Sequence, residues 1–496
     1  MTLFSSLLAI LLLSSSHAGV IYVNNLTGND RNNGSGSSPV ASISRALQLV
    51  KTSGIIEVIN TGKVYQSPYP GPDGSLLHVN TGGTPEKPLE IRGNGSVITG
   101  LAVIPSSKWR FDEKKGVYTL PFRPMSNLYK KMPDATHNFW PDTSAKIWWL
   151  NGKAAPNCKN LETLKKTPGA FWWNKAEKQV CFNLPEGKKL AEQKIELPAN
   201  AGFYITAPYV LIRDFYYIFS WNDGFDSAGL GYDGTYRNCI AVNNCGQGFS
   251  CHATGSTLYE DCAAIGCNSS GSCDVDQSFS RYMRCIFLNN TFEGGIHTNY
   301  NSQHYYGSCI IAGNFPFEQL WISRSSSQHY FNCLIEGTPE QDILSFRHNT
   351  GTASFRNCTI KGGKSFFTLV KNGSSSVAFQ SCILGGSRDK LFISEPGTRS
   401  RLQNWDNVYF DIPGLVFNGK TYTKKEFSAY LKANPQDRNS LWLEKEPSLP
   451  CSVNKKAAGA NLPESVLKRY EKLKRLRAAA SGIHFENSKT SIQKGK

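Results

Sequence analysis

The sequence of 496 residues has no apolar run long enough to cross a bilayer. Its one candidate, Leu3–Leu13, is well short of the roughly 20 residues that a membrane span requires, which excludes a transmembrane helix. Charged residues make up only 19% of the chain. Between Cys239 and Cys382 no stretch has the 3.6-residue rhythm of an amphipathic helix, so helical repeat architectures are excluded there. The short apolar alternations in this region are broken by Gly, Asn and Ser, which is typical of strands and turns.

A ladder of seven similar cysteine motifs fills the same region. The motifs recur every 23 to 25 residues, as in TYRNCIAV, RYMRCIFL and SFRNCTIK. Their cysteines are Cys239, Cys262, Cys285, Cys309, Cys333, Cys358 and Cys382. A fixed period of this size indicates a solenoid. We therefore predict an all-β fold, a parallel β-helix solenoid with coils of about 24 residues that each contact only their neighbours.

Breaks in this rhythm divide the chain into five segments. We expect a signal peptide over 1–18, an N-terminal cap and first coils over 19–107, a β-rich insert over 108–198, regular coils over 199–445 and a basic tail over 446–496. An amphipathic stretch at 40–50 is predicted to be a short capping helix, because a solenoid end exposes unpaired strand edges and apolar core. ESVLKRYEKLKRLRAAA is predicted to be a basic C-terminal helix, and TYTKKEFSAYLKANPQDRNSLW to close the far end.

The apolar run near the N-terminus ends in Ser16-His17-Ala18, a small-residue pattern typical of secretory signal cleavage. The sequence therefore predicts a secreted protein, extracellular or periplasmic, that starts near Gly19 and is a monomer. The formal charge is +16, and residues 452–496 hold +8 of it, from 11 Lys and Arg against 3 Asp and Glu. The modestly basic remainder favours an acidic partner such as a polyanionic glycan, or reflects solubility alone. No nucleic-acid partner is expected.

Fourteen cysteines in an exported chain would normally indicate disulfides. Equivalent residues of stacked coils lie roughly 4.8 Å apart with parallel side chains, whereas a disulfide needs a specific Cβ geometry. The cysteine ladder is therefore predicted to consist of small buried hydrophobic side chains. The better disulfide candidates are Cys158–Cys181, Cys245–Cys267 and Cys251–Cys273.

Several segments resemble a known group of proteins. YVNNLTGND, SPVASISRALQLV and PLEIRGNGSVITG resemble the opening of extracellular right-handed parallel β-helix proteins of the pectate-lyase-like superfamily. FSAYLKANPQDRNSLW is similar to the closing segment of polysaccharide lyases and glycoside hydrolases of that superfamily. WNDGFDS followed by GFSCHAT resembles a group of β-helix proteins from glycan-degrading bacteria. The resemblance implies this fold and a polysaccharide substrate, although a shared fold does not fix activity.

The resemblance also implies calcium as a cofactor, because calcium-dependent pectate lyases of this fold carry clustered Asp and Glu ligands and a Lys or Arg base. This sequence departs from that pattern. The corresponding face is rich in His and has only two or three carboxylates. No metal ligands are therefore assigned.

A second strand is expected after each cysteine strand, as in GFSCHAT, SCDVDQS, GIHTNYN and LWISRSS. The residues expected to point into the coil are Cys251, Cys273, Ile296, Ile322, Phe346 and Leu369. Their neighbours then point outward and form columns along the stack. One column is His252, Asp274, His297, Trp321 and Ser345; the next is Asp276, Asn299, Ser323 and Arg347, with Arg324 and His348 at the strand ends. The shorter period at SCDVDQS leaves two registers open for that coil.

These columns hold more ionisable side chains than folding requires. The predicted catalytic residues are His252, Asp274, Asp276 and His297. The predicted substrate-binding residues are Asn299, Trp321, Arg324, Arg347, His348 and Asp226. A carboxylate beside an imidazole raises its pKa and orients its ring, arginines bind carboxylate or sulfate bidentately, and a tryptophan offers a flat face to a sugar. The alternatives are a solvated ladder of ion pairs and a Zn or Mn site at His252, Asp274 and His297.

The columns favour a secreted enzyme that cleaves an extracellular acidic polysaccharide. β-Elimination would use His252 or His297 as the base, with an arginine to stabilise the enolate. It is favoured here because His and Arg outnumber the carboxylates. Hydrolysis would instead use two of Asp226, Asp274 and Asp276 as acid and base. A non-catalytic glycan-binding or cell-surface solenoid is the alternative from a different class, and it predicts that the cluster tolerates substitution.

Overall fold

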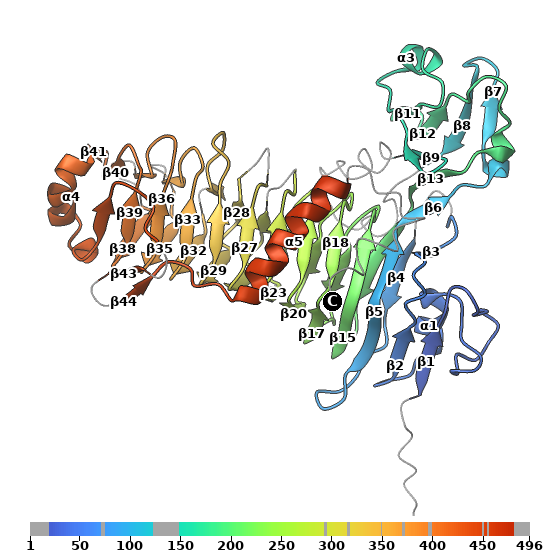
Figure 1. Ribbon diagram of the computed structural model, residues 1–496, viewed down its shortest axis with the longest axis horizontal. Coiled ribbons are helices and arrows are strands. Elements are labelled where there is room, and N and C mark those ends of the chain that lie inside the picture. The colour runs from blue at the N-terminus through green and yellow to red at the C-terminus, as the bar shows by residue number, and fades with distance from the viewer. Residues whose placement is uncertain are drawn as a thin grey trace, which may run out of the picture.

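The computed structural model describes residues 19–70, 75–122, 148–291, 295–314, 318–348, 350–369, 373–394, 399–448, 451–453 and 456–480. The predicted signal peptide lies outside these residues. Figure 1 shows a long stack of coils, a β-rich lobe at its N-terminal end and one C-terminal helix across the stack. The predicted fold class is confirmed, because strands of successive coils pair in parallel register along the whole stack. No described helix is both long and apolar enough to cross a membrane.

Eight coils of three strands each form the regular part of the solenoid. The first strands are β16 (Phe225–Ala228), β19 (Phe249–His252), β22 (Ser272–Asp274), β25 (Ile296–Thr298), β28 (Leu320–Ser323), β31 (Leu344–Arg347), β34 (Phe367–Leu369) and β37 (Phe392–Ser394). The second strands are β17 (Gly234–Arg237), β20 (Ser256–Glu260), β23 (Phe279–Met283), β26 (Gln303–Gly307), β29 (Ser327–Phe331), β32 (Thr352–Arg356), β35 (Ser376–Gln380) and β38 (Arg401–Trp405). The third strands are β18 (Ile240–Val242), β21 (Ala263–Ile265), β24 (Ile286–Leu288), β27 (Ile310–Ala312), β30 (Leu334–Glu336), β33 (Thr359–Lys361), β36 (Ile383–Gly385) and β39 (Val408–Phe410).

The ladder cysteines sit at the corner between the second and third strands. The residue before each cysteine has a left-handed backbone, as at Asn238 (φ 50°) and Asp261 (φ 51°), and such corners favour Asn and Asp. Each thiol is fully buried and donates to the carbonyl two residues earlier, at 3.3–3.5 Å. Most also reach a carbonyl of the preceding coil, as Cys309 reaches Tyr282 O at 3.4 Å. Most of these corner carbonyls also accept a backbone N–H of the preceding coil, so the thiol adds a second, weak donor to a carbonyl that is already paired.

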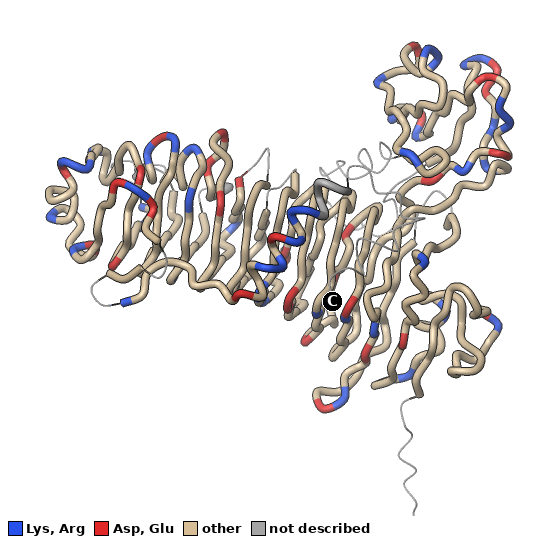
Figure 2. Tube along the Cα trace, in the orientation of Figure 1, with Lys and Arg blue, Asp and Glu red and all other residues tan. Residues whose placement is uncertain are grey.

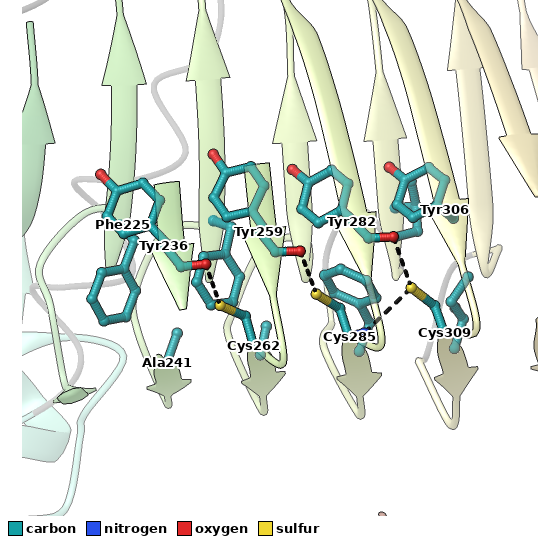
Figure 3. Packing of buried hydrophobic residues seen from close by; sticks show 14 of the residues in the cluster. Phe225, Tyr236, Ala241, Tyr259, Cys262, Tyr282, Cys285, Tyr306 and Cys309 are labelled. Atoms are coloured by element: carbon teal, nitrogen blue, oxygen red, sulfur yellow. Dashed lines mark hydrogen bonds between the residues drawn. The ribbon is translucent and has the colours of Figure 1, made fainter. Parts of the chain in front are cut away.

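A stack of aromatic rings lies beside the cysteines (Figure 3). Tyr236, Tyr259, Tyr282, Tyr306 and Tyr330 follow one another with centroids 4.4–5.4 Å apart and nearly parallel planes. All fourteen cysteines are free thiols. The three candidate disulfides are therefore absent, and cysteine in this chain acts as packing and as a hydrogen-bond donor.

The N-terminal end is closed by irregular coils and a short helix (Figure 1). The elements are β1 (Val20–Val23), α1 (Ile43–Leu49), β2 (Ile55–Val58), β3 (Tyr65–Gln66), β4 (Ser75–Val79), β5 (Leu89–Thr99), β14 (Asn200–Ile205) and β15 (Val210–Ile218). The Ser42 hydroxyl caps α1 by accepting from the Arg45 N–H at 3.1 Å. The helix buries Ile43, Ala46 and Leu47 against the core, which confirms the predicted capping helix.

The lobe between β5 and β14 consists of two antiparallel four-stranded sheets. Its elements are β6 (Leu101–Val103), β7 (Arg110–Asp112), β8 (Val117–Pro121), β9 (Trp149–Leu150), β10 (Lys153–Ala154), α3 (Leu161–Lys165), β11 (Phe171–Asn174), β12 (Gln179–Phe182) and β13 (Ile195–Pro198). It has a separate aromatic core in which Trp148 stacks on Phe171 with centroids 4.5 Å apart. Trp148 is therefore a core residue of the lobe.

The C-terminal elements close the far end and return along the coils. They are β40 (Leu415–Phe417), β41 (Lys420–Tyr422), α4 (Phe427–Ala433), β42 (Leu441–Leu443), β43 (Cys451–Val453), β44 (Lys456–Ala458) and α5 (Glu464–Ala480). Helix α5 lies across the third strands and packs Val466, Tyr470 and Leu473 on their outward apolar residues. The guanidinium of Arg469 donates to the carbonyl of Cys262 at 2.6 Å. Figure 2 shows the basic residues of the helix, whose other face is exposed.

Candidate active site

The first strands of the coils continue into β14 and β4, so one parallel sheet runs from β31 to β4. Its backbone register fixes which side chains share a face. One outward column is His78, Tyr204, Asp226, Ser250, Cys273, His297, Trp321 and Ser345. The adjacent inward column is Ser227, Cys251, Asp274, Thr298, Ile322 and Phe346.

The expected outward position of Asp274 is wrong. Asp274 pairs with Cys251 and Thr298 in the register, so it points into the coil interior, and Cys273 takes the outward position. Asp274 is fully buried, accepts from the Tyr282 hydroxyl at 2.9 and 3.1 Å, and has an oxygen 3.1 Å from His304 Nδ1. The sequence left two registers open for this coil. The structure has the one in which Asp274, not Cys273, is equivalent to Cys251. The acid–base group expected from His252, Asp274 and His297 therefore does not exist.

His297 and Trp321 do share the outward column, but they stack on each other with ring centroids 4.5 Å apart. One face of Trp321 is thereby covered by an imidazole rather than offered to a sugar. The Nδ1 atom of His297 lies 3.3 Å from Cys273 Sγ, and His297 is only 6% exposed. His297 is two coils from His252, about 10 Å along the stack, so the two imidazoles do not share one site.

A pocket of about 170 Å³ opens on the outward face of the sheet where β4, β14, β16 and β19 meet. Its volume is below the roughly 300–1,000 Å³ of pockets for drug-sized ligands, so it suits one small ring rather than a large ligand. Its lining residues are Leu76, Ala201, Gly202, Phe203, Tyr204, Asn222, Asp223, Asp226, Ala228, His252, Ala253 and Asp276. Three carboxylates and one imidazole face this space, and its described lining contains no Lys or Arg.

Two aspartates and one histidine form the centre of the pocket. His252 Nε2 lies 3.6 Å from Asp226 Oδ1 and 3.9 Å from Asp223 Oδ2. Asp226 comes from β16 and His252 from the end of β19, while Asp223 belongs to the turn just before β16. One ligand atom from each of the three lies within 4.8 Å of the others. The turn is tight, because a Cβ at Gly224 would meet Asn244 Nδ2 at 2.4 Å.

Hydrogen bonds fix Asp223 and leave the other two groups open. Asp223 accepts from the Gln247 N–H and from the Ser250 hydroxyl, both at 2.8 Å. By contrast, Asp226 Oδ1 and both ring nitrogens of His252 are buried and have no hydrogen-bond partner among the described residues. Buried polar atoms without hydrogen-bond partners call for an explanation, and a bound ligand, ion or water that completes their bonding is one. The two open groups point to the place where a substrate would be held.

The electrostatics of the three groups are strongly perturbed. Burial raises the pKa of Asp226 to about 7, with the Asp223 charge adding to the effect and His252 opposing it. Burial alone would lower the pKa of His252, but the carboxylates of Asp226 and Asp223 outweigh it and raise the value to about 9. Near neutral pH the imidazole is therefore protonated, while Asp226 is divided between its acid and carboxylate forms.

The remaining predicted residues lie along the corner that follows the first strands. Asp276 lines the pocket. Asn299 is half-buried, with its side-chain oxygen accepting from the Tyr300 N–H at 2.9 Å. The guanidinium of Arg324 lies 4.0 Å above the centre of the Tyr300 ring. His348 is exposed, and the side chain of Arg347 lies outside the described structure.

Sequence reasoning missed several residues of the pocket. Asp223 is absent from the predicted site residues, yet it lies in the turn before β16 and faces His252. Tyr204 and His78 continue the outward column beyond Asp226, with ring centroids 5.6 Å apart. The signal for Asp223 was the WNDGFDS motif one period before GFSCHAT. No signal linked β4 and β14 to these motifs, because the 101–198 segment separates the two strands in the chain.

The calcium implied by the family resemblance does not fit this donor set. Calcium takes six to eight oxygen ligands, whereas the cluster offers two carboxylates and an imidazole. Two carboxylates with one imidazole suit Mn or Zn better, but no fourth protein ligand is present in the described cluster.

No protein-family model matches this sequence, and no curated protein matches it significantly. Among solved structures, XylC in complex with xylose is 10% identical, covers 81% of this chain and 86% of its own, and has a TM-score of 0.48. Pectate lyase Pel9A is 12% identical, covers 90% and 94%, and has a TM-score of 0.46. A rhamnogalacturonan lyase is 9% identical, covers 89% and 87%, and has a TM-score of 0.35. Likeness at this level does not identify an activity, so function has to be inferred from the residues of the pocket.

Proposed function

We propose that this protein is an enzyme that cleaves glycosidic bonds of a polysaccharide, with Asp223, Asp226 and His252 as its reaction centre. The observation that carries the proposal is the buried Asp226 Oδ1, which has no hydrogen-bond partner among the described residues and lies 3.6 Å from His252 Nε2 in a pocket sized for one sugar ring. A packed, purely structural column would have satisfied these atoms within the protein.

Hydrolysis is the reaction that the geometry supports best. Two carboxylates with different environments are the common requirement of glycoside hydrolysis, one as acid and one as base or nucleophile. Asp226 has a pKa raised to about 7 by burial and can carry the proton. Asp223 accepts two hydrogen bonds, as an ionised carboxylate does. Their proximity favours direct attack over attack through water, which needs carboxyl groups roughly 6.5–9.5 Å apart.

The proposed reaction has two steps. In the first, Asp226 donates its proton to the glycosidic oxygen as the bond to the anomeric carbon breaks, and an Asp223 oxygen forms a bond to that carbon. In the second, water attacks the same carbon, Asp226 takes up the water proton, and Asp223 leaves as a carboxylate. The protonated His252 offsets the negative charge of the pair throughout.

β-Elimination, which the sequence alone favoured, is the second candidate. It is supported by the two unpartnered ring nitrogens of His252, which could reach a sugar proton. Two observations weigh against it. A base whose pKa is about 9 is largely protonated at neutral pH, and the described lining of the pocket offers no Lys or Arg to neutralise a uronate carboxylate.

Product chemistry tests the proposal. The purified protein is incubated with a panel of neutral, uronate-containing and sulfated polysaccharides, and both new reducing ends and the ultraviolet absorbance of unsaturated uronate are measured. Hydrolysis predicts reducing ends without that absorbance. Asp226→Asn should lower kcat by about 10²–10⁴-fold, while Asp233→Asn, on an exposed turn of the same coil, should have no effect. Equal activity of both variants would refute the assigned centre.

We also propose that the protein is exported and acts on glycans outside the cytoplasm, because a signal-like segment precedes Gly19. Expression of the full chain in a secreting host should give a mature N-terminus near Gly19. Retention of Met1 on the folded product would contradict export by this route.

A further inference from the structure

A second ladder of equivalent side chains starts at the pocket and runs along one corner of the solenoid. The register that pairs Asp274, Thr298 and Ile322 places Asp276, Tyr300 and Arg324 at the same corner position of three consecutive coils. All three have left-handed backbones, with φ of 62°, 54° and 49°. The residue after each is also left-handed, so the three turns have one shape and project these side chains in the same direction.

Charge changes sign along this corner. Asp276 lines the pocket beside two further aspartates. Tyr300 is neutral, and Arg324 follows one coil later with His348 beyond it. At roughly 4.8 Å per coil, Arg324 lies about 10 Å from Asp276. Arg324 is three coils from His252 and four from Asp226, roughly 14–19 Å along the stack, so an acidic reaction centre and a cationic position lie on one continuous edge.

Arg324 is built as an anion-binding group rather than as part of an ion pair. Its guanidinium is held 4.0 Å above the Tyr300 ring, and no carboxylate of the described residues forms a salt bridge with it. By comparison, Arg284 and Arg237 of neighbouring coils are both paired with acids. Stacking on an aromatic face fixes the plane of the guanidinium and leaves its edge free for bidentate contact with a carboxylate or sulfate.

We propose that Arg324, positioned by Tyr300, binds an acidic sugar of the substrate three to four coils away from the bond that is cleaved, and that the sugar in the pocket is uncharged. This proposal rests on the proposed function and specifies its substrate class. A uronate inside the pocket would meet Asp223, Asp226 and Asp276, and the only cation in the described lining is His252, which already faces two of these aspartates. Charge repulsion therefore disfavours a uronate there. The substrate is therefore a heteropolysaccharide that combines neutral and acidic residues, not a homopolymer of uronate.

Binding can be tested without turnover in the Asp226→Asn background. Affinity electrophoresis would use gels containing hyaluronan, in which uronate alternates with a neutral sugar, chondroitin sulfate, polygalacturonate as a uronate homopolymer, and a neutral galactan. We expect retention by an acidic heteropolymer. Arg324→Gln should weaken it about tenfold or more, and Arg324→Lys should weaken it partly, because lysine keeps the charge but not the planar fork. Arg281→Gln is the matched control, since Arg281 is exposed on the next face and forms no described ion pair.

Substitutions of Tyr300 give a second test, because they change no charge and so separate the position of the guanidinium from the net charge of the protein. Tyr300→Phe keeps the ring and should bind as the parent does, whereas Tyr300→Leu removes it and should weaken binding without loss of folded structure by circular dichroism. Four results would each overturn the proposal. Two concern binding in general: equal effects of Arg324→Gln and Arg281→Gln, or retention by no polymer. Two concern the substrate class: retention by the neutral galactan alone, or binding and cleavage of polygalacturonate in preference to the heteropolymers. Retention that depends on Arg324 with no cleavage by the wild type would instead refute the proposed function alone.

Discussion

Replacement of Asp274 tests most directly where this side chain lies. It is fully buried beneath the first-strand sheet, hydrogen-bonded to Tyr282 and 3.1 Å from His304 Nδ1. Burial raises the pKa of Asp274 to about 7 and lowers that of His304 to about 3. An asparagine reproduces the shape and neutral hydrogen bonding of the protonated acid, whereas an alanine leaves the Tyr282 hydroxyl unpaired and creates a cavity.

The expected magnitudes follow from these contacts. Asp274→Ala should lower the free energy of unfolding by about 3 kcal/mol, from one unsatisfied buried hydroxyl and the lost volume. The effect of Asp274→Asn depends on pH. The pKa of Asp274 is higher in the folded than in the unfolded protein, so protonation of Asp274 stabilises the wild-type fold. The wild type loses this stabilisation as pH rises from about 4 to about 7. The stability of Asp274→Asn relative to wild type should therefore rise across this window by about 4 kcal/mol, at about 1.4 kcal/mol per unit.

Urea unfolding followed by tryptophan fluorescence at pH 4.5 and pH 7 would measure these differences (roughly the two ends of the window). Folded Asp274→Asn should also keep its glycan-cleaving activity. Two results would refute the reasoning. One is a pH-independent loss of stability as large as that of the alanine variant. The other is loss of turnover in a folded Asp274→Asn protein, which would place this carboxylate at the substrate rather than in the interior.

Three further predictions follow from the site, the cysteines and the C-terminal helix. Activity should fall as pH rises through about 7, where Asp226 loses its proton; a pH–rate profile that instead rises towards pH 9, where His252 becomes neutral, would indicate elimination. Ellman's reagent should titrate fourteen thiols after unfolding without reductant but at most the half-buried Cys451 in the native protein; fewer thiols in denaturant would reveal disulfides. Tyr470→Ala should loosen α5, cost about 2 kcal/mol and expose an apolar strip that binds a hydrophobic dye; unchanged dye binding and stability would show that the helix does not cover that strip.

The solenoid could be predicted from sequence because its repeat is local. Each cysteine motif combines a left-handed corner residue, an inward thiol and a short apolar strand, and the chain repeats this unit every 23 to 25 residues. A period read from the chain therefore gives the number of residues per coil and the presence of parallel strands. It also places Asp226 and His252 in neighbouring coils.

The site depended on details that a period does not contain. A difference of one residue in the coil of SCDVDQS exchanges the two faces of β22, so Cys273 faces outward and Asp274 inward. The pocket also needs β4 and β14, which reach it only because the chain returns to the stack after the separate lobe.

Sequence by itself determined the coil length, the all-β architecture and the gathering of His and Asp on a few coils, because each of these repeats or clusters along the chain. Only the tertiary structure decided which of those groups meet. A shift of one residue in strand register moves a side chain from the core to the surface. Burial then sets the pKa of each carboxyl group, and so which of them is protonated.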